Sequence, residues 1–199
     1  MDRLIRSGLE ALTSRGYSSA GLESILRQAG VPKGSFYHYF PSKEAFGRAL
    51  LDAYQLYFSA RLMRCFDDTL LPPLARLQQW TELAIKGMAK HDYERGCLVG
   101  NLATETAMLP ADFVAEVEAV WLDWQQRLAA LLEEARAKGE IPADSDCEEL
   151  AEFFWTGWEG AVLRARLQKD SAPMRRFLAH FFRYCSALKT KEETGGNHV

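Results

Sequence analysis

The chain of 199 residues lacks the features that mark several large classes of protein. Its four cysteines lie far apart, without a Cys-x-x-Cys pair or a Cys/His cluster, which argues against a zinc site and a disulfide framework. No apolar run approaches the roughly 18 residues of a membrane span, and no signal peptide opens the chain. We find no glycine-rich loop after a strand and no nucleophile–base set. These absences predict a cytoplasmic protein that is not an enzyme and has no metal, cofactor or membrane partner.

The apolar residues that are present recur with helical spacing in almost every segment. No alternation of the strand type extends beyond four residues, so the pattern predicts an all-α fold of about nine helices. The expected helices cover approximately residues 4–15, 22–29, 33–39, 42–66, 74–90, 97–109, 112–138, 146–168 and 171–188. The polar segment 189–199 is predicted to be a disordered tail.

Charge is distributed unevenly along the chain, although the whole chain carries a formal charge of only −3. Residues 1–48 contain seven Lys and Arg against four Asp and Glu, which gives +3, while the remainder contains 17 against 23, which gives −6. A basic small segment attached to an acidic larger one is the asymmetry expected of a DNA-binding head on a separate body.

The most informative stretch begins at Gly30 and reads Gly-Val-Pro-Lys-Gly-Ser-Phe-Tyr-His-Tyr-Phe-Pro-Ser-Lys. It follows the amphipathic helix 22–29, so residues 21–40 form a helix, a tight turn and a second short helix, which is the helix-turn-helix pattern. The second helix is too short to bury all of its aromatic side chains. Helical geometry predicts that Phe36 and Phe40 face inward, while Tyr37, His38 and Tyr39 face outward, with core packing as the alternative for each of these three.

This stretch, together with Gly16-Tyr17 and Ser42-Lys43-Glu44-Ala45-Phe46, closely resembles the head of the TetR family of transcriptional regulators. The resemblance covers about residues 3–50 and implies a DNA-binding domain at 1–48, followed by an effector-binding and dimerisation domain at 49–188. It implies DNA contacts from Lys33, Gly34, Ser35, Tyr37, His38, Tyr39 and Lys43. Contacts to phosphates set the register of a protein on the DNA and do not read the base sequence. The sequence departs from the family at Ala20-Gly21, where a phosphate-binding Thr is often found.

Two predicted helices, 147–168 and 172–188, carry more apolar positions than one neighbour can cover. A short connection makes them antiparallel neighbours, and Gly157, Gly160 and Ala161 permit close approach of a further helix. They therefore predict a homodimer through a symmetric four-helix interface, with a single-chain core as the alternative.

The effector site is less sharply indicated by the sequence. Five tryptophans fall in the body, and Trp121, Trp155 and Trp158 are our candidates for an aromatic pocket, with core packing as the alternative. Asn101 and Glu105 follow Cys97 at helical spacing, so they either fix a polar ligand or belong to a solvated face.

Cys97 lies at a predicted helix start after Arg95-Gly96, a place where a thiol pKa can be lowered. The segment Gly96-Cys97-Leu98-Val99-Gly100-Asn101-Leu102 resembles the NemR-like subgroup of the family, which includes electrophile- and oxidant-responsive repressors. Cys97 is either such a sensor or a small buried apolar residue.

Together these patterns predict a ligand- or electrophile-responsive repressor that binds a pseudo-palindromic double-stranded DNA operator as a dimer and is released by an effector. Two alternatives stay open. One is a transcriptional activator of the same fold, and the other is a small-molecule or redox sensor that does not act by operator release.

Overall fold

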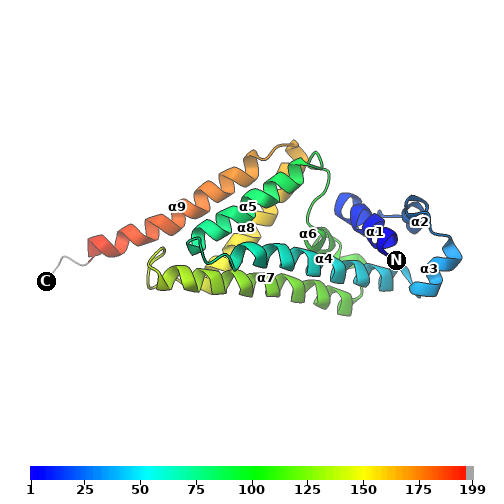
Figure 1. Cartoon of the computed structure of the whole chain (residues 1–199), viewed down its shortest axis with the longest axis horizontal. Coiled ribbons are helices and arrows are strands. Elements are labelled where there is room, and N and C mark those ends of the chain that lie inside the picture. Colours follow the sequence, from blue (N-terminus) through cyan, green and yellow to red (C-terminus); the bar gives the residue numbers. More distant parts are fainter. Residues whose placement is uncertain (196–199) are drawn as a thin grey trace. The chain divides into compact units, whose positions relative to one another are not determined.

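The computed structural model describes the backbone of residues 1–195 and the side chains of residues 1–186. Within this range the chain forms nine α-helices, one short 3₁₀ helix and no strand, which confirms the predicted all-α fold (Figure 1). The helices are α1 (Asp2–Arg15), α2 (Leu22–Ala29), α3 (Lys33–Tyr39), α4 (Lys43–Phe66), α5 (Pro73–Ala89), α6 (Leu98–Ala103), the 3₁₀ helix η1 (Thr106–Met108), α7 (Ala111–Ala137), α8 (Cys147–Gln168) and α9 (Ala172–Gly195).

The chain divides into two compact units that are each discontinuous in sequence. The first unit contains Met1–Ala60 and Glu94–Trp121, and the second contains Arg61–Tyr93 and the residues from Leu122 onward. By compactness, α6 and the start of α7 therefore belong with the helix-turn-helix. The boundary between the DNA-binding domain at 1–48 and the effector-binding domain at 49–188 is a functional division, and it stays a prediction.

Glycine and proline set the ends of the first helices. α2 ends in a Schellman motif, in which Gly30 has a φ of 67° and the N–H of Val31 donates to the carbonyl of Leu26 at 2.9 Å. Pro32 then disfavours helical backbone at Val31, so α3 must begin as a new helix. Ser42 caps α4, because its hydroxyl accepts a hydrogen bond from the N–H of Ala45 at 3.0 Å. The predicted bounds of α2 and α3 are confirmed.

The segment predicted as one helix from 97 to 109 is interrupted, and that prediction was wrong. α6 ends at Ala103, and η1 begins only at Thr106. At the break, the hydroxyl of Thr104 donates to the carbonyl of Asn101 at 2.7 Å, a local bond of the kind that competes with continued helix. Glu105 then leaves the helical conformation, and its carboxylate accepts hydrogen bonds from the backbone of Tyr17 and Ser18.

Aromatic side chains form the core of the second unit. The ring centroid of Trp80 on α5 lies 5.3 Å from that of Trp155 and 5.5 Å from that of Trp158, both on α8. Trp124 on α7 lies 5.6 Å from Trp155 and accepts, at its backbone carbonyl, a hydrogen bond from the indole N–H of Trp155 at 3.1 Å. This cluster holds α5, α7 and α8 together.

A buried arginine joins other parts of the same unit. Only 2% of the Arg76 side chain is exposed, and its guanidinium pairs with both carboxylate oxygens of Glu134 on α7, at 2.7 and 3.0 Å. The same guanidinium donates to the carbonyls of Phe66 and Leu71. These four hydrogen bonds offset the cost of burying the charge and connect the end of α4, α5 and α7.

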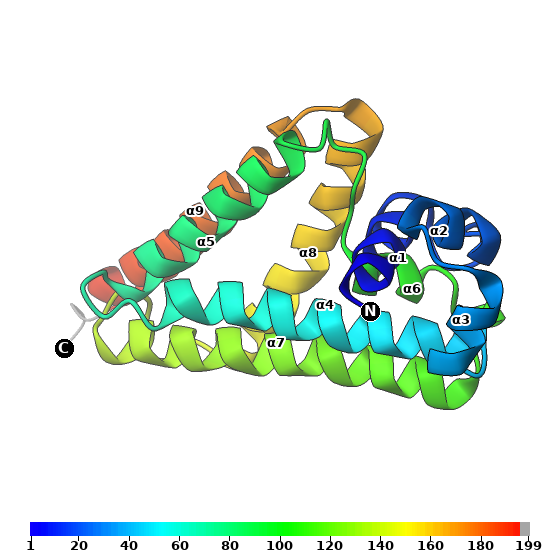
Figure 2. The same cartoon turned by 45° about the vertical axis from the view of Figure 1, so that its right-hand side comes forward.

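α8 and α9 run antiparallel beside one another, as predicted (Figures 1 and 2). α9 continues to Gly195, so the expected tail beginning at residue 189 is helical as far as residue 195. The Lys- and Glu-containing residues there are good helix formers despite their polarity. Residues 196–199, the rest of the expected tail, lie outside the described residues. Among the residues that were described, no helix is long and apolar enough to cross a membrane.

The burial of Trp155 generates the first prediction. Trp155→Ala should lower the free energy of unfolding by about 3–5 kcal/mol, because it removes a ring that contacts two other tryptophans and leaves a cavity. Trp155→Phe should cost clearly less. Chemical denaturation followed by circular dichroism measures both, and a loss below about 1 kcal/mol for the alanine variant would show that this ring does not support the core.

Candidate nucleic-acid interface

α3 is anchored to the first unit by a cluster of three phenylalanines. Phe36 is fully buried and Phe40 is 9% exposed, which confirms that both face inward. The Phe36 ring meets Phe40 and Phe46 at centroid distances of 5.6 and 5.4 Å, and Phe46 comes from α4. The orientation of α3 is therefore fixed by packing between α3 and α4 rather than by the intrinsic stability of its seven residues.

The opposite face of α3 presents polar aromatic side chains to solvent. Tyr37 is 50% exposed and Tyr39 is 51% exposed, and His38 is exposed between them. The ring of Tyr37 leans edge-on against Phe36 at 5.2 Å, and the His38 and Tyr39 rings lie 5.4 Å apart. Because their inner neighbours are rigid, these three side chains are displayed in a defined direction, as a reading surface requires.

The beginning of α3 offers groups that suit a phosphate. Lys33, Gly34 and Ser35 are exposed. The first backbone N–H groups of a helix have no intrahelical acceptor, and no side chain caps them at the start of α3. Apart from the backbone of α3 itself, a Cβ built on Gly34 would meet no atom of the described residues within 4 Å, and the lack of a side chain leaves the approach to this backbone open. The ammonium of Lys33 pairs with Glu23 at 3.2 Å, a solvated ion pair that DNA could replace.

Lys43 lies in a different environment from the one that the sequence suggested. Its ammonium donates to the carbonyl of Tyr17 at 2.8 Å and sits 4.6 Å from the centre of the Tyr17 ring. Partial burial lowers the pKa of Lys43. Its DNA contact stays a prediction, and in the structure Lys43 joins α4 to the loop between α1 and α2.

Arg48 fixes the same end of α4 to α7. Its guanidinium pairs with Glu44 and with Asp112, each at 2.8 Å, and also with Glu116. It lies 4.8 Å from the centre of the Phe113 ring. Hydrogen bonds from Arg48 hold the pKa of the Asp112 carboxyl below its usual value.

Asn101 and Glu105 contact the helix-turn-helix part of the first unit. The Asn101 side-chain amide donates to the carbonyls of Leu12 and Thr13, and the Glu105 carboxylate accepts from the N–H groups of Tyr17 and Ser18. The prediction that they share one helix face was wrong, because α6 ends at Ala103 and Glu105 lies after it, although both side chains contact the end of α1 or the loop that follows it. Their proposed ligand contacts stay untested predictions.

Cys97 is the N-cap of α6 and is 9% exposed. Its Sγ accepts a hydrogen bond from the N–H of Gly100 at 3.5 Å. Arg95, which we expected to support a thiolate, directs its guanidinium to Glu10 at 2.6 Å.

The other three cysteines have environments that suppress reactivity. Burial raises the pKa of the Cys147 and Cys185 thiols to about 11 and also raises the pKa of Cys65. Few of these thiols are ionised near neutral pH, so they are poor nucleophiles. Cys97 is buried as well, and it is the cysteine that the sequence singles out for a chemical test.

The three candidate tryptophans do not gather in one unit. Trp155 and Trp158 are buried in the aromatic core of the second unit, whereas Trp121 is half-buried and belongs to the first unit. The packed rings around Trp155 and Trp158 favour the core role that the sequence left as the alternative.

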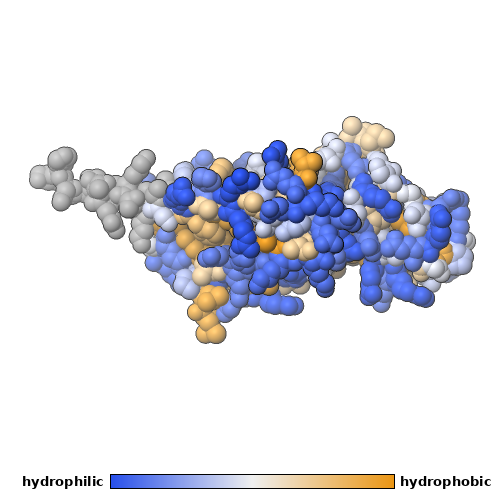
Figure 3. Space-filling model, turned by 90° about the horizontal axis from the view of Figure 1, so that it is seen from above, coloured by the Kyte–Doolittle hydropathy of each residue, from blue (hydrophilic) through white to orange (hydrophobic). Residues whose placement is uncertain are grey.

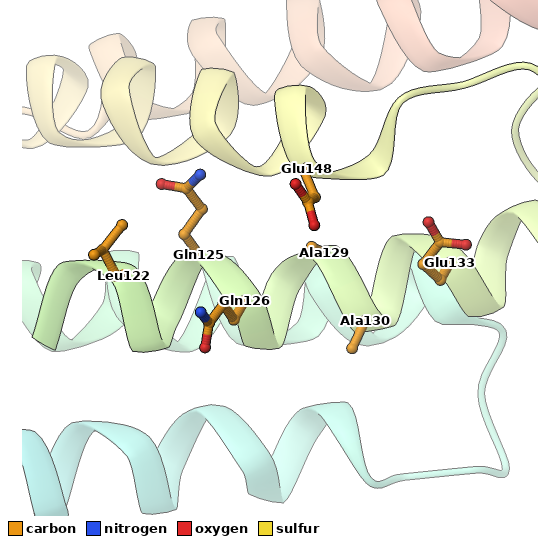
Figure 4. Close-up of a pocket in the computed structure, with 7 residues that line it drawn as sticks. All are labelled: Leu122, Gln125, Gln126, Ala129, Ala130, Glu133 and Glu148. Atoms are coloured by element: carbon orange, nitrogen blue, oxygen red, sulfur yellow. The ribbon is translucent and has the colours of Figure 1, made fainter. Parts of the chain in front are cut away.

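A hollow of about 510 Å³ lies elsewhere, beside α7 and the start of α8 (Figure 4). Gln125 and Glu148 project into the space between these two helices. The lining residues are Leu122, Gln125, Gln126, Ala129, Ala130, Glu133 and Glu148. None of them was among the predicted effector residues, because glutamine and glutamate on a long amphipathic helix are typical of its solvent-exposed face.

Two family models match the chain and between them cover most of it. The model for bacterial regulatory proteins of the tetR family matches residues 4–50, and the model for the tetracyclin repressor-like C-terminal domain matches residues 73–181. The chain belongs to the TetR family. This confirms the resemblance carried by the residues around α3.

Similar proteins agree with this assignment. The chain is 53% identical over 181 residues to the transcriptional regulator AcuR of Cereibacter sphaeroides, covering 91% of this chain and 83% of that protein. It is 28% identical over 179 residues to the transcriptional repressor NemR of Escherichia coli K12, covering 90% of each. A crystal structure of a regulatory protein TetR from Rhodobacter sphaeroides has 53% identity and a TM-score of 0.90, covering 92% of this chain and 96% of that one.

As a TetR-family member, the protein is a DNA-binding transcriptional regulator and not an enzyme. The family model that ends at residue 50 contains α2, α3 and the start of α4, where the exposed aromatic face and Lys43 lie. The individual DNA contacts of this TetR-family head stay predictions.

Tyr37→Ala tests the reading face of α3 directly. We expect affinity for all DNA sequences to fall at least about 10-fold, or ~1.4 kcal/mol, because an exposed contact is removed. Tyr37→Phe keeps the ring packed on Phe36, so it distinguishes the contribution of the hydroxyl to DNA affinity from that of the ring. Fluorescence anisotropy with labelled duplexes measures affinity, and thermal melting checks the fold. Unchanged affinity for the alanine variant would exclude Tyr37 as a DNA contact.

Proposed function

We propose that the protein is an effector-responsive repressor that binds a pseudo-palindromic operator as a homodimer and is released when an effector binds or modifies its body. The observation that carries the proposal is the geometry of α3, in which buried Phe36 and Phe40 hold Tyr37, His38 and Tyr39 outward. Family membership supports DNA as the partner of this face.

A single α3 touches few base pairs, so useful operator affinity requires a second copy. In helix-turn-helix dimers the two recognition helices read half-sites about 34–36 Å apart or a multiple of that distance. The symmetry of the dimer is then mirrored by a pseudo-palindromic operator. In this proposal α3 enters the major groove, and Lys33, Gly34, Ser35 and Lys43 contact the backbone.

The outward face of α8 and α9 supports dimerisation through these helices. Phe153 is 52% exposed, Leu163 is 60% exposed and Leu167 is 75% exposed, and Tyr184 on α9 is also half-exposed. Apart from the backbone of α8 itself, a Cβ built on Gly160 would meet no atom of the described residues within 4 Å, so another helix can approach closely there. Figure 3 shows hydrophobic side chains interrupting a mainly hydrophilic face of the molecule.

The charge pattern along α8 suits self-association. Exposed Glu149 and Glu152 lie near its beginning, and exposed Arg164 lies near its end. A two-fold axis perpendicular to α8 near Gly160 makes the two copies of the helix antiparallel. It therefore places the acidic half of one copy beside the basic half of the other, with the apolar residues between them.

Release follows if the effector prefers a dimer whose two heads no longer match successive major grooves. A preference of about 10- to 100-fold corresponds to roughly 1.4–2.8 kcal/mol of coupling free energy. α4 is the proposed lever, because its residues belong to both compact units. The effector is either a small ligand of the body or an electrophile that modifies Cys97.

Leu163→Glu tests the dimer. We expect the dimer dissociation constant to rise at least 100-fold, because two symmetry-related carboxylates would be placed in an apolar interface. Leu70→Glu is the matched control, since Leu70 is 93% exposed in the loop before α5. Sedimentation velocity measures the association, and operator affinity should fall in parallel. Equal association of the two variants would contradict an interface through α8.

Cys97→Ser tests the electrophile proposal. Serine is a favourable N-cap, so the start of α6 is retained while the nucleophile is lost. Treatment with a thiol-reactive aldehyde should lower operator affinity about 10-fold or more in the native protein and leave the variant unaffected. Equal loss of DNA binding in both proteins would exclude Cys97 as the sensor.

A further inference from the structure

The segment that follows α5 in the chain is bonded to the end of α1. The N–H of Gly96 donates to the carbonyl of Thr13 at 2.9 Å. The side-chain amide of Asn101 donates to the carbonyl of Leu12 at 2.8 Å, which also accepts from the N–H of Gly16, and to the carbonyl of Thr13 at 3.1 Å, so it bonds to carbonyls in the last turn of α1. Arg95 adds an ion pair with Glu10 on α1.

Glu105 makes the most specific of these contacts. One carboxylate oxygen accepts from the N–H of Tyr17 at 2.9 Å, and the other accepts from the N–H of Ser18 at 2.6 Å. Two consecutive backbone N–H groups form a concave anion site of the kind called a nest. Gly16 has a φ of +83°, and a Cβ there would collide with the Glu105 carboxylate. Gly16 thus permits the backbone shape and leaves room for the carboxylate.

Tyr17 is held on its other sides by α4 and α7. Its carbonyl accepts from Lys43, and its ring stacks edge-on against Phe113 with centroids 6.0 Å apart. A Cβ on Gly47 would come within 2.8 Å of the ring, so glycine is needed on this side. We call Tyr17, Lys43, Glu105 and Phe113 the Tyr17 clamp.

The position of this clamp in the chain connects it with DNA reading. The loop that carries Tyr17 leads into α2, whose last turn sets the start of α3. Lys43 bonds to the same tyrosine and is one of the predicted phosphate contacts. Without the Glu105 hydrogen bonds the loop would no longer be held in place. The positions of α2 and Lys43 would then no longer be fixed through it.

We propose that Glu105 and Asn101 are positioning residues for DNA reading, which hold the loop between α1 and α2 so that α3 and Lys43 engage the operator together. Neither residue contacts DNA in this account. This positioning role differs from the ligand contact that the sequence led us to expect for these two residues. The inference rests on the proposed function of the protein as an operator-binding repressor.

The decisive experiment compares Glu105→Gln with Glu118→Gln in the full chain. Both variants remove one negative charge, and Glu118 is exposed on α7 in the same unit. Glutamine at 105 turns one acceptor into a donor that faces a backbone N–H. At fixed salt, operator affinity should fall at least 10-fold for Glu105→Gln and should not fall for Glu118→Gln.

Binding to non-operator DNA separates positioning from general damage. Non-specific affinity depends mainly on charge, so it should be unchanged or slightly higher in both variants. The specificity ratio should therefore fall only for Glu105→Gln. Hydrogen exchange should become faster at Tyr17 and Ser18 in that variant, while the thermal transition stays cooperative.

Operator affinity and specificity equal to those of Glu118→Gln would overturn the inference, even if Glu105→Gln melts at a lower temperature. Should Glu105→Gln fail to fold, Glu105→Asp replaces it under the same criteria, since it keeps the charge and shortens the reach by one methylene. Failure of the native protein to bind any selected operator would instead count against the proposed function.

Discussion

The two hydrogen bonds that the Glu105 carboxylate accepts from consecutive backbone amides tie distant parts of the first unit together. It joins a residue after α6 to the loop between α1 and α2, two parts of the chain that are far apart in sequence. Because Tyr17 also bonds to Lys43 and packs on Phe113, the loop, α4 and α7 are fixed through one residue. Together with the contacts of Gly96, Asn101 and Arg95 to α1, these contacts join Glu94–Trp121 to the helix-turn-helix part of the first unit.

The reading helix illustrates how a short element can be made rigid. Seven residues are too few for a stable isolated helix, so α3 relies on the Schellman turn before it and on Phe36 and Phe40 beneath it. The exposed tyrosines and His38 take their direction from these anchors. Rigidity on one face and polarity on the other are what a DNA-reading helix requires, and both come from the same short stretch of sequence.

Much of this could be predicted from the residues alone, because Gly30, Pro32 and Ser42 are strong local signals. The helical pattern of α2 and α3 and the inward turn of Phe36 followed from spacing. The end of α6 and the roles of Asn101, Glu105 and Lys43 could not be predicted. Their partners are backbone groups brought close only by the tertiary fold, and no periodicity encodes them. For a related reason the sequence could not distinguish a pocket role from a core role for the candidate tryptophans, since indole rings suit a ligand pocket and a packed core equally well.

In the proposed function α3, held by the first unit, reads a two-fold operator. Selection of bound duplexes from a random pool tests it most directly. We expect enrichment of one pseudo-palindromic sequence, with half-site centres separated by about one helical turn or a multiple of it. Enrichment of no sequence, with binding set only by salt concentration, would contradict it.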